Sequence, residues 1–443
     1  MPPCRRGDGL GQNKNSWRLP RSLLDSGPMA ERRSGMARNS FVSLFSGAGG
    51  LDIGLEEAGW VCHYASDLDD DAVETLTRNK GRRLVHAVAL QDAFVERADV
   101  RRSAGKDILA KGGVRRGEIT LLAGGPPCQS WSSAGHQHGF EDPRGQLFAD
   151  FVRVADELDV RWLIFENVRG LLTARGPDGI PGSALHLIRT RLLEAGFQTA
   201  VTLLNAADFG LPQRRVRLFV VGYRVGDMPP FPVATHSKDP HGKLTPWMSL
   251  GECLRSVGPL SDDEVIRPTG NLAQELALVP PGSGVKSPGK AETTRPGGHW
   301  GYKQGAFVAD LAVPARTVTA SAQQDWVKDP VLGLRRLCPR ECAAIQTFPT
   351  SWVFAGNRTS QYRQIGNAVP PKLAELVGRS LLDCVSSQRT GGTVRPLALL
   401  PLPEQLAQAV RYTAKEEARN GQSRKEAPRK RVSKLPVLQA KAI

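Results

Sequence analysis

Short apolar runs alternate with amphipathic stretches between residues 41 and 225. The apolar runs predict strands at FVSLF (41–45), WVCHYAS (60–66), ITLLA (119–123), WLIFE (162–166), FQTAVTLLN (197–205) and RLFVVGY (217–223). Helical periodicity predicts helices near residues 51–58, 70–78, 145–158 and 183–195. Strands that alternate with helices are typical of a parallel sheet with helices on both faces. We therefore expect an α/β fold with a doubly wound, mostly parallel sheet.

The alternation stops after Tyr223. Residues 226–315 are rich in Pro, Gly, Ser, His and Thr and contain the interruptions PPFP, PPGSG and RPGG, which indicate a small irregular domain or an insertion. Helical patterns return at 335–347 and 371–385, and a charged helix-like stretch follows at 403–420. These changes divide the chain into segments 1–40, 41–225, 226–330, 331–385 and 386–443.

The formal charge of +15 is concentrated at the two ends of the 443-residue chain. Residues 1–40 carry +5 and residues 386–443 carry +8, which leaves +2 for the segment between them. Both end segments are poor in aromatic residues, and we expect them to be basic and flexible. Solvated disorder and salt-sensitive contact with phosphate groups both explain such segments, and charge alone does not choose between them.

Cysteine usage and hydropathy indicate a soluble intracellular protein. The seven cysteines are scattered and odd in number, so a disulfide framework is not expected. Cys338 and Cys342 suit one face of a helix better than a metal site, and no His lies near them. No apolar run approaches the roughly 18 residues that span a bilayer, and the N-terminus lacks the apolar core of a signal peptide.

A glycine-rich turn, FSGAGGLDIGLEEAGW (45–60), joins the first predicted strand to the first helix. Such turns bind dinucleotides, phosphates or adenosyl cofactors, or form a tight turn without a ligand. Asp67 ends the next strand, where an acid would accept hydrogen bonds from a ribose diol. Asp69, Asp70 and Asp71 are expected to cap the following helix. Asp92 follows a third predicted strand within VHAVAL (85–90) and could reach an adenine edge.

Two further motifs place reactive groups at strand ends. In ITLLAGGPPCQSWSSAG (119–135), Cys128 lies just past a strand on a turn stiffened by Pro126 and Pro127. A catalytic thiol must be exposed and held in a fixed position, which such a rigid turn provides, whereas an isolated loop cysteine is usually inert. WLIFENV (162–168) delivers Glu166 and Asn167 at the end of a buried strand, where a helix cap or an ion pair is the alternative to catalysis.

The remaining candidate site residues have basic or amide side chains. FGLPQRRVRLFVVGY (209–223) places Arg215 and Arg217 on same-facing positions of a strand. Guanidinium groups suit phosphate and carbonyl oxygens, and solvation at the surface is the alternative. Asn367 lies in YRQIGNAVPPKLAELVG (362–378), which we interpret as a loop leading into a helix.

The order of these motifs resembles that of the DNA (cytosine-5)-methyltransferase family, from about Phe41 to Gly378. FSGAGG is similar to the cofactor loop of the family, GGPPCQSWSSAG to its nucleophile motif and ENV to its catalytic motif. QRRVR is similar to its basic strand motif. LRRLCPRECAAIQTFP and YRQIGNAVPP are similar to its last two blocks. Six motifs in the family order make the resemblance specific.

The resemblance implies a methyltransferase fold that binds S-adenosylmethionine, with 41–225 as the catalytic domain and 226–330 as a smaller target-recognition domain. Residues 331–385 would hold the final motifs and a helix that returns to the catalytic domain. Cys128 would add to carbon 6 of a cytosine flipped out of the duplex, and Glu166 would hold its N3 and exocyclic amine. Arg217 would contact the base carbonyl and Arg215 would position the site. The implied cofactor pocket comprises Phe45, Gly47, Gly49, Leu51, Asp67, Asp92, Pro127, Leu147, Asn367 and Val369.

The same resemblance implies double-stranded DNA as the substrate, with no metal and no membrane. We expect a monomer in the bacterial cytoplasm, associated with the nucleoid when bound to DNA. It would be of the restriction-modification or orphan type, and a cognate endonuclease would need no stable complex with it. Three features depart from the family pattern: Asp67 stands where Glu is common, Trp131 stands where Phe is usual, and the long 93–118 stretch displaces the third-strand acid, Asp92.

Three alternatives remain at this stage. An RNA cytosine methyltransferase of the transfer-RNA type would share the chemistry, but the long 226–315 segment argues for reading a duplex. A dinucleotide-binding oxidoreductase would share only the glycine turn and Asp67. A DNA-binding protein without activity is disfavoured because Cys128, Glu166 and Asn167 are intact.

Overall fold

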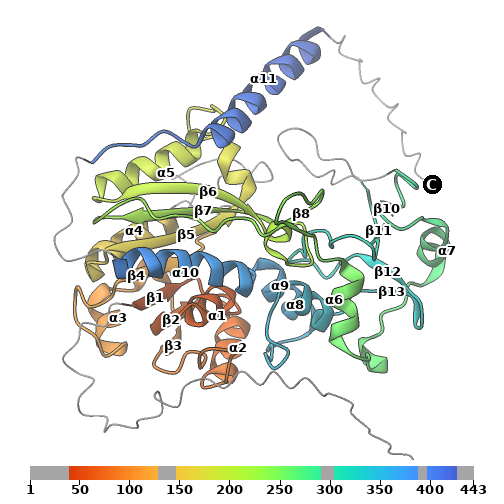
Figure 1. Ribbon diagram of the computed structural model, residues 1–443, viewed down its shortest axis with the longest axis horizontal. Helices are drawn as coiled ribbons and strands as arrows, with labels where there is room; N and C mark the ends of the chain where they lie inside the picture. The colour runs from red at the N-terminus through yellow and green to blue at the C-terminus, as the bar shows by residue number, and fades with distance from the viewer. Residues whose placement is uncertain (1–38, 128–145, 291–303, 388–396, 427–443) are drawn as a thin grey trace, which may run out of the picture. The chain divides into compact units, whose positions relative to one another are not determined.

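The computed structural model describes residues 39–127, 146–290, 304–387 and 397–426 (Figure 1). Its centre is a seven-stranded sheet in the order β3-β2-β1-β4-β5-β7-β6. The strands are β1 (Ser40–Leu44), β2 (Val61–Asp67), β3 (Phe94–Arg97), β4 (Leu121–Gly124), β5 (Trp162–Val168), β6 (Gln198–Asn205) and β7 (Val216–Tyr223). Only β7 is antiparallel to its two neighbours in this sheet. The predicted α/β class with a mostly parallel sheet is confirmed.

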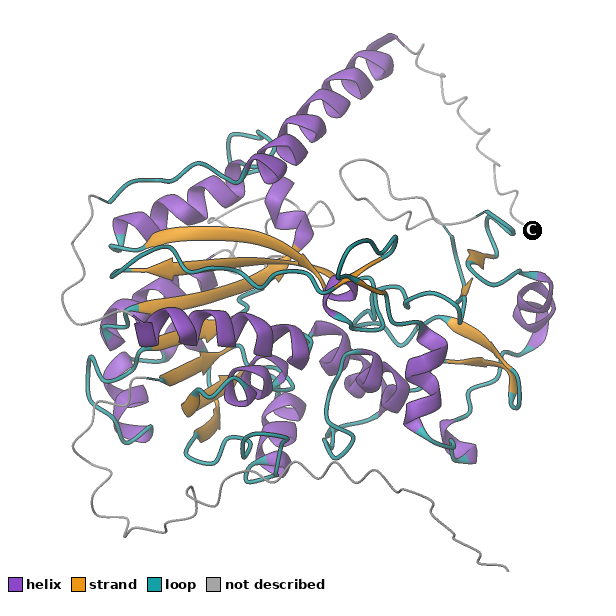
Figure 2. Ribbon diagram, in the orientation of Figure 1, coloured by secondary structure: helices purple, strands orange, loops and turns teal. Residues whose placement is uncertain are grey.

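Helices cover both faces of this sheet (Figure 2). On one face lie α1 (Gly50–Glu57), α2 (Asp70–Asn79) and α10 (Pro371–Ser387), and on the other lie α3 (Gly105–Lys111), α4 (Gln146–Leu158) and α5 (Ser183–Glu194). Neighbouring residues of one strand point to opposite faces, so Leu121 packs with the first group and Leu122 with the second. Both faces are therefore buried, which explains the continuous apolar runs of these strands.

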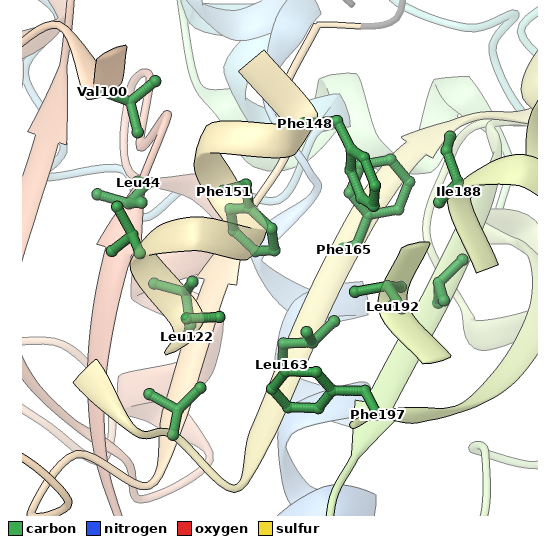
Figure 3. Packing of buried hydrophobic residues seen from close by; sticks show 14 of the residues in the cluster. Leu44, Val100, Leu122, Phe148, Phe151, Leu163, Phe165, Ile188, Leu192 and Phe197 are labelled. Carbon is green, nitrogen blue, oxygen red and sulfur yellow. The ribbon is translucent and has the colours of Figure 1, made fainter. Parts of the chain in front are cut away.

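The face that carries α4 and α5 has an aromatic core (Figure 3). Phe148 and Phe151 of α4 pack on Phe165 of β5, with ring centroids 5.3 Å and 6.4 Å apart, respectively. Leu163 of the same strand and Ile188 of α5 belong to the same cluster, and each is at most 1% exposed. This packing holds β5 rigidly, and β5 is the strand that ends in Glu166 and Asn167.

The opposite face is closed by a helix from the far end of the sequence. α10 packs against α1, and the indole Nε1 of Trp60 donates a hydrogen bond to the carbonyl oxygen of Gly378 at 2.9 Å. Leu373, Val377 and Leu381 of α10 are buried in the core on this side. Residues distant in sequence thereby complete the layer beside the glycine-rich turn.

The third predicted strand was wrong. Residues 85–90 form turns, and the third strand of the sheet is β3 at Phe94–Arg97. The backbone of the 82–89 segment bonds to itself, since Leu84 N donates to Ala87 O and Ala89 N donates to Arg82 O, both at 2.9 Å. Leu84 and Ala89 are buried in a core cluster that also contains Ile53 of α1, so their apolar character comes from packing outside the sheet and does not reflect a strand.

The described residues between 226 and 337 form short elements, and the loop-rich character predicted for 226–315 agrees with this. They are β8 (His236–Ser237), β9 (Thr245–Pro246), α6 (Leu250–Val257), η6 (Asp262–Glu264) and α7 (Gly270–Leu278), followed by β10 (Ser283–Gly284), β11 (Phe307–Val308), β12 (Trp326–Asp329) and β13 (Gly333–Arg336). The last four form a separate small sheet. Arg335 of β13 is 2% exposed and pairs with Asp329 at 2.7 Å and with Glu341 at 2.8 Å. The pair with Glu341 fastens the β12–β13 hairpin to α8 (Pro339–Ile345).

Two segments after residue 350 bear on the prediction. Residues 362–367, interpreted as the start of a loop, belong to helix α9 (Arg358–Asn367), which begins at the N-cap Asn357. The helix-like stretch predicted at 403–420 lies within α11 (Glu404–Glu426), inside the tail that was expected to be flexible, and Leu406 of this helix is 8% exposed and belongs to the core cluster that contains residues of α5. Among the described helices, none is long and apolar enough to cross a membrane.

Candidate active site

The carboxyl ends of β1, β2, β4 and β5 meet at one cavity of about 590 Å³. Parallel strands place their ends at a common edge, so residues from separate motifs converge there. Most of the predicted cofactor residues line this cavity, namely Phe45, Gly47, Leu51, Asp67, Pro127, Leu147, Asn367 and Val369. Glu166 and Arg217, predicted to be catalytic, line it as well. The structure thus brings the two predicted groups together.

The glycine-rich turn follows β1 and shapes one wall of the cavity. Gly47 has φ 54, a left-handed conformation that favours glycine, and a Cβ built on it would meet nothing within 4 Å. A Cβ at Gly50 would lie only 2.2 Å from the carbonyl oxygen of Val369, so this position allows α1 to approach the cavity wall closely. The turn therefore leaves open space beside Gly47 for a ligand.

Gly49 does not line the cavity, which corrects its predicted role. It precedes α1 with φ 83, and a Cβ there would lie 2.9 Å from Leu76 Cδ2 and 3.1 Å from Trp352 Cζ2. The glycine is required because Trp352 packs on the turn and donates a hydrogen bond from Nε1 to Ala48 O at 3.1 Å. The described contacts of Gly49 are thus close packing contacts with Trp352 and Leu76.

Asp67 braces the glycine-rich turn from the end of β2. Its Oδ2 accepts a hydrogen bond from Gly47 N at 2.8 Å, and its Oδ1 accepts one from Asp69 N at 2.9 Å. Burial raises the pKa of this carboxyl, while the two backbone donors oppose that rise. Each oxygen keeps a further lone pair, so Asp67 can still accept a hydrogen bond from a ribose hydroxyl.

Asp69 caps α2, as predicted, because its Oδ1 accepts a hydrogen bond from Ala72 N at 3.1 Å. Its Oδ2 lies 2.6 Å from the guanidinium of Arg363 on α9, and both side chains line the cavity. Arg363 was not among the predicted site residues. It belongs to the YRQIGN motif, and the helical conformation of that motif turns it toward the acidic cluster of α2.

Asp92, predicted to reach an adenine edge, is not among the residues that line the cavity. It precedes β3, whereas the cavity lies at the carboxyl ends of the strands. The residues that follow β3 line the cavity instead, namely Ala98, Asp99, Val100 and Arg101. Arg101 Nε donates to Asp99 Oδ1 at 2.9 Å, and this contact lowers the pKa of Asp99. Asp99 was missed because β3, with the sequence FVER, has no buried apolar pattern.

Glu166 is held deep in the cavity. Its side chain is 9% exposed, and its Oε1 lies 3.1 Å from Nε of Arg217. A Cβ at Gly125 would lie 3.1 Å from the other carboxyl oxygen, so this glycine gives the carboxyl its space. Burial raises the pKa of Glu166, and the charges of Arg217 and Arg215 only partly oppose it. The carboxyl therefore holds a proton to higher pH than an exposed glutamate does.

Asn167 connects the end of β5 to the turn that leads toward Cys128. Its Nδ2 donates to Pro126 O at 3.0 Å, and its Oδ1 accepts a hydrogen bond from Val168 N at 2.9 Å. The bond from Asn167 to Pro126 fixes the position of the 124–127 turn relative to Glu166, the residue before Asn167. Cys128, the predicted nucleophile, and Trp131 lie outside the described residues.

Arg217 and Arg215 do not share one environment. Arg217 lies opposite Val168 in the antiparallel β5–β7 pair, which aims it at Glu166. Arg215 precedes β7, is fully buried and does not line the cavity. It donates hydrogen bonds to the carbonyl oxygens of Val318 (2.8 Å), Gly366 (2.7 Å) and Ala368 (2.8 Å). Arg215 is thus a positioning residue that holds the backbone on both sides of Asn367.

Arg215→Met should destabilise the protein by about 3–5 kcal/mol, because the backbone oxygens around it would lose charge-assisted donors in a buried site. Urea unfolding measures this change. Arg115, whose side chain is 90% exposed, offers a matched control, and Arg115→Met should change stability by less than about 0.5 kcal/mol. A loss below about 1 kcal/mol in Arg215→Met would contradict the role assigned to this residue.

The cavity fits S-adenosylmethionine, the methyl donor that the motifs imply. It offers an acid at the tip of β2 for a ribose diol and open space beside Gly47. Its volume of about 590 Å³ lies within the range of small-molecule sites. Within the described ranges, no group of three or more His, Cys, Asp or Glu side chains is placed to hold a metal ion.

Comparison with known proteins identifies the relatives of this chain. Residues 39–383 match the family described as C-5 cytosine-specific DNA methylase. The chain is 32% identical to the Type II methyltransferase M.Eco47II of Escherichia coli, over 78% of this chain and 80% of that protein. It is 31% identical to the Type II methyltransferase M.SacI of Streptomyces achromogenes, over 80% of this chain and 95% of that protein.

Solved structures share the fold. A DNA modification methyltransferase encoded within an E. coli prophage is similar over 79% of this chain and 99% of its own, with a TM-score of 0.53 at 21% identity. The S. pombe Dnmt2 methyltransferase is similar over 77% of this chain and 97% of its own, with a TM-score of 0.52 at 16% identity. At such identities the likeness concerns the fold alone.

Proposed function

The chain belongs to the C-5 cytosine-specific DNA methylase family and is a DNA (cytosine-5)-methyltransferase, and from this premise we propose that it methylates one specific cytosine in double-stranded DNA through a covalent Cys128 adduct. One observation carries the proposal. A buried carboxyl, Glu166, and a guanidinium, Arg217, line the same cavity as the glycine-rich turn and Asp67. Groups suited to a pyrimidine edge therefore adjoin groups suited to the methyl donor.

The chemistry of cytosine requires this combination. Carbon 5 is a poor nucleophile, and addition of the Cys128 thiolate to carbon 6 would convert the ring to an enamine with electron density at carbon 5. Glu166 would donate a proton toward N3 and accept a hydrogen bond from the exocyclic amine. Arg217 would donate a hydrogen bond to the base carbonyl. S-adenosylmethionine supplies the electrophilic methyl group, and loss of the carbon 5 proton followed by release of Cys128 ends the cycle.

The raised pKa of Glu166 supports its role as the proton donor. Its protonated form is present below the raised pKa and is lost as the pH increases through that value. A carboxyl with an ordinary pKa would be almost fully ionised near neutral pH and a poor donor. Burial in the cavity therefore prepares Glu166 for the reaction.

The depth of Glu166 argues for a flipped base. Its side chain is only 9% exposed, so a cytosine stacked within a duplex could not reach it. A base rotated out of the helix could enter the cavity edge-first. The 226–330 segment, which supplies β10, β11 and β12 of the small sheet, is the part of the chain that we assign to reading the flanking sequence. The Type II names of the relatives support a restriction-modification context.

A methylation assay tests the proposal directly. The protein is incubated with double-stranded DNA and labelled S-adenosylmethionine, and the methylated positions are mapped by sequencing. We expect label at carbon 5 of cytosine within one short sequence, and no incorporation without the protein. Label on adenine, label on the exocyclic amine of cytosine, or no label at all would refute the proposed function.

RNA and single-stranded DNA of the same sequence serve as competing substrates. Duplex DNA should be methylated faster than either, because a recognition segment that reads a duplex finds its contacts only there. A transfer RNA methylated faster than duplex DNA would favour the RNA methyltransferase alternative.

A further inference from the structure

The family match ends at residue 383, yet the described chain continues beyond it. We call residues 397–416 the C-terminal arm; it consists of a short extended stretch and the first part of α11. Figure 1 shows α11 beginning beside α5 and running away from the sheet. The arm contacts η4 (Arg169–Thr173), the 3-10 helix that follows β5. The family resemblance assigns it no function.

The first anchor of the arm is Arg189 of α5. This side chain is 4% exposed and donates from Nε to Thr199 Oγ1 at 3.0 Å and from Nη2 to the carbonyl oxygen of Leu400. No described carboxylate pairs with it, and burial lowers its pKa. The carbonyl oxygen of Leu400 therefore accepts a hydrogen bond from a buried guanidinium that has few other acceptors. This bond ties the arm to α5 of the catalytic domain.

The second anchor is apolar. Leu406 is 8% exposed and belongs to the core cluster that also contains Leu171 and Leu172 of η4. Val410 packs on Gly182 at the start of α5, where a Cβ would lie 2.8 Å from its Cγ1. The same Cβ would lie 3.5 Å from the carbonyl oxygen of Leu172. Two residues of the arm thus cover η4 and the turn that leads into α5.

η4 is connected directly to the catalytic strand. Val168, its N-cap, lines the cavity and follows Glu166 and Asn167 of β5 without any intervening residue. Leu171 and Leu172 are each 1% exposed, so η4 cannot shift unless their packing changes. A displacement of η4 would move Val168 and with it the Asn167 bond to Pro126.

We propose that the C-terminal arm is a positioning element of the active site. By packing Leu406 and Val410 against η4 and Gly182, it holds the end of β5 so that Glu166 and the 124–127 turn keep their relative placement. The glycine-rich turn and Asp67, at the ends of β1 and β2, lie on the far side of β4 from β5, so the arm should affect kcat more than binding of the methyl donor. The proposal rests on the proposed function, because its test measures the rate of methyl transfer.

Steady-state kinetics of Leu406→Ala in the full chain test this inference, at a temperature well below its melting temperature. We expect kcat to fall by about tenfold, because small displacements of reacting groups are costly, and KM for S-adenosylmethionine to stay within about twofold. Leu406→Met, which conserves volume, should restore kcat. Tyr412→Ala is the matched control: Tyr412 is 39% exposed on the same helix, and its loss should leave both parameters unchanged.

Arg189→Met provides a second, independent variant, because it removes the other anchor without touching α11. Arg189→Met should show the same loss of kcat with an unchanged KM for S-adenosylmethionine. If Leu406→Ala does not fold, this variant replaces it in the test. A folded variant with a lower melting temperature and wild-type kcat would overturn the proposal and reduce the arm to a structural role. A wild-type enzyme without methyl transfer would instead refute the proposed function.

Discussion

Replacing Cys128 with alanine should abolish methyl transfer while leaving the protein folded. The proposed reaction needs the thiolate to activate carbon 5, and none of the described cavity residues is a nucleophile of comparable strength. We expect kcat to fall by about 10⁴-fold or more, which corresponds to about 5 kcal/mol of activation free energy. Incorporation of labelled methyl groups into duplex DNA measures this change.

A trapped adduct gives a second readout for Cys128. DNA with 5-fluorocytosine at the target position would be attacked at carbon 6 and methylated at carbon 5, but fluorine cannot leave as a proton does, so the carbon–sulfur bond would persist. The wild-type protein should therefore stay attached to this DNA in a denaturing gel, and Cys128→Ala should not. Cys384→Ser is the control, since Cys384 is a partly exposed thiol on α10, and it should behave as the wild type. A stable adduct in Cys128→Ala would contradict the assignment.

Glu166→Gln should lower kcat by about 10²–10⁴-fold with little change in the affinity for DNA. Glutamine can donate its amide hydrogens to N3 and accept a hydrogen bond from the exocyclic amine, so the base should still be held. It cannot transfer a proton, and the adduct would lose its stabilisation. Single-turnover rates together with DNA binding separate the two effects. Glu194→Gln, on the exposed surface of α5, should match the wild type.

The pH dependence of the same variant provides a further check. Because burial raises the pKa of Glu166, wild-type kcat should decrease as the pH rises through that pKa and the proton is lost. Glutamine does not titrate, so the low rate of Glu166→Gln should lack this decrease. An identical decrease in both proteins would assign the titration to another group and would remove Glu166 as the proton donor.

Much of the catalytic domain could be predicted from local pattern. β1, β2, β4, β5, β6 and β7 are buried on both faces or nearly so, and each appears in the sequence as an apolar run. β3 could not be found in this way, because FVER lies at the edge of the sheet and carries charged residues. That single error placed the predicted acid at Asp92, which precedes β3, whereas Asp99, which follows β3, lines the cavity.

Residues in the same motif also proved to have different functions. Arg215 and Arg217 are two positions apart, yet one is buried against backbone carbonyls and the other faces Glu166. Gly47 and Gly49 differ likewise, since one borders the cavity and the other faces Trp352. In each pair, the two residues differ in environment because at least one of them contacts a residue far away in the sequence, such as Gly366, Glu166 or Trp352. A local sequence motif does not contain these contacts.

Apolar periodicity and short motifs are local properties, and they were enough to predict the strands and helices around the catalytic motifs, except β3, together with the chemical groups that these motifs supply. Which of these groups share the cavity, how deeply Glu166 is buried and which acid follows β3 are evident only in the folded chain. The packing of the C-terminal arm on η4 is likewise evident only there. Burial and the pKa shift of Glu166 arise from contacts between segments that are distant along the chain, and such contacts exist only once the sheet and its helices are assembled.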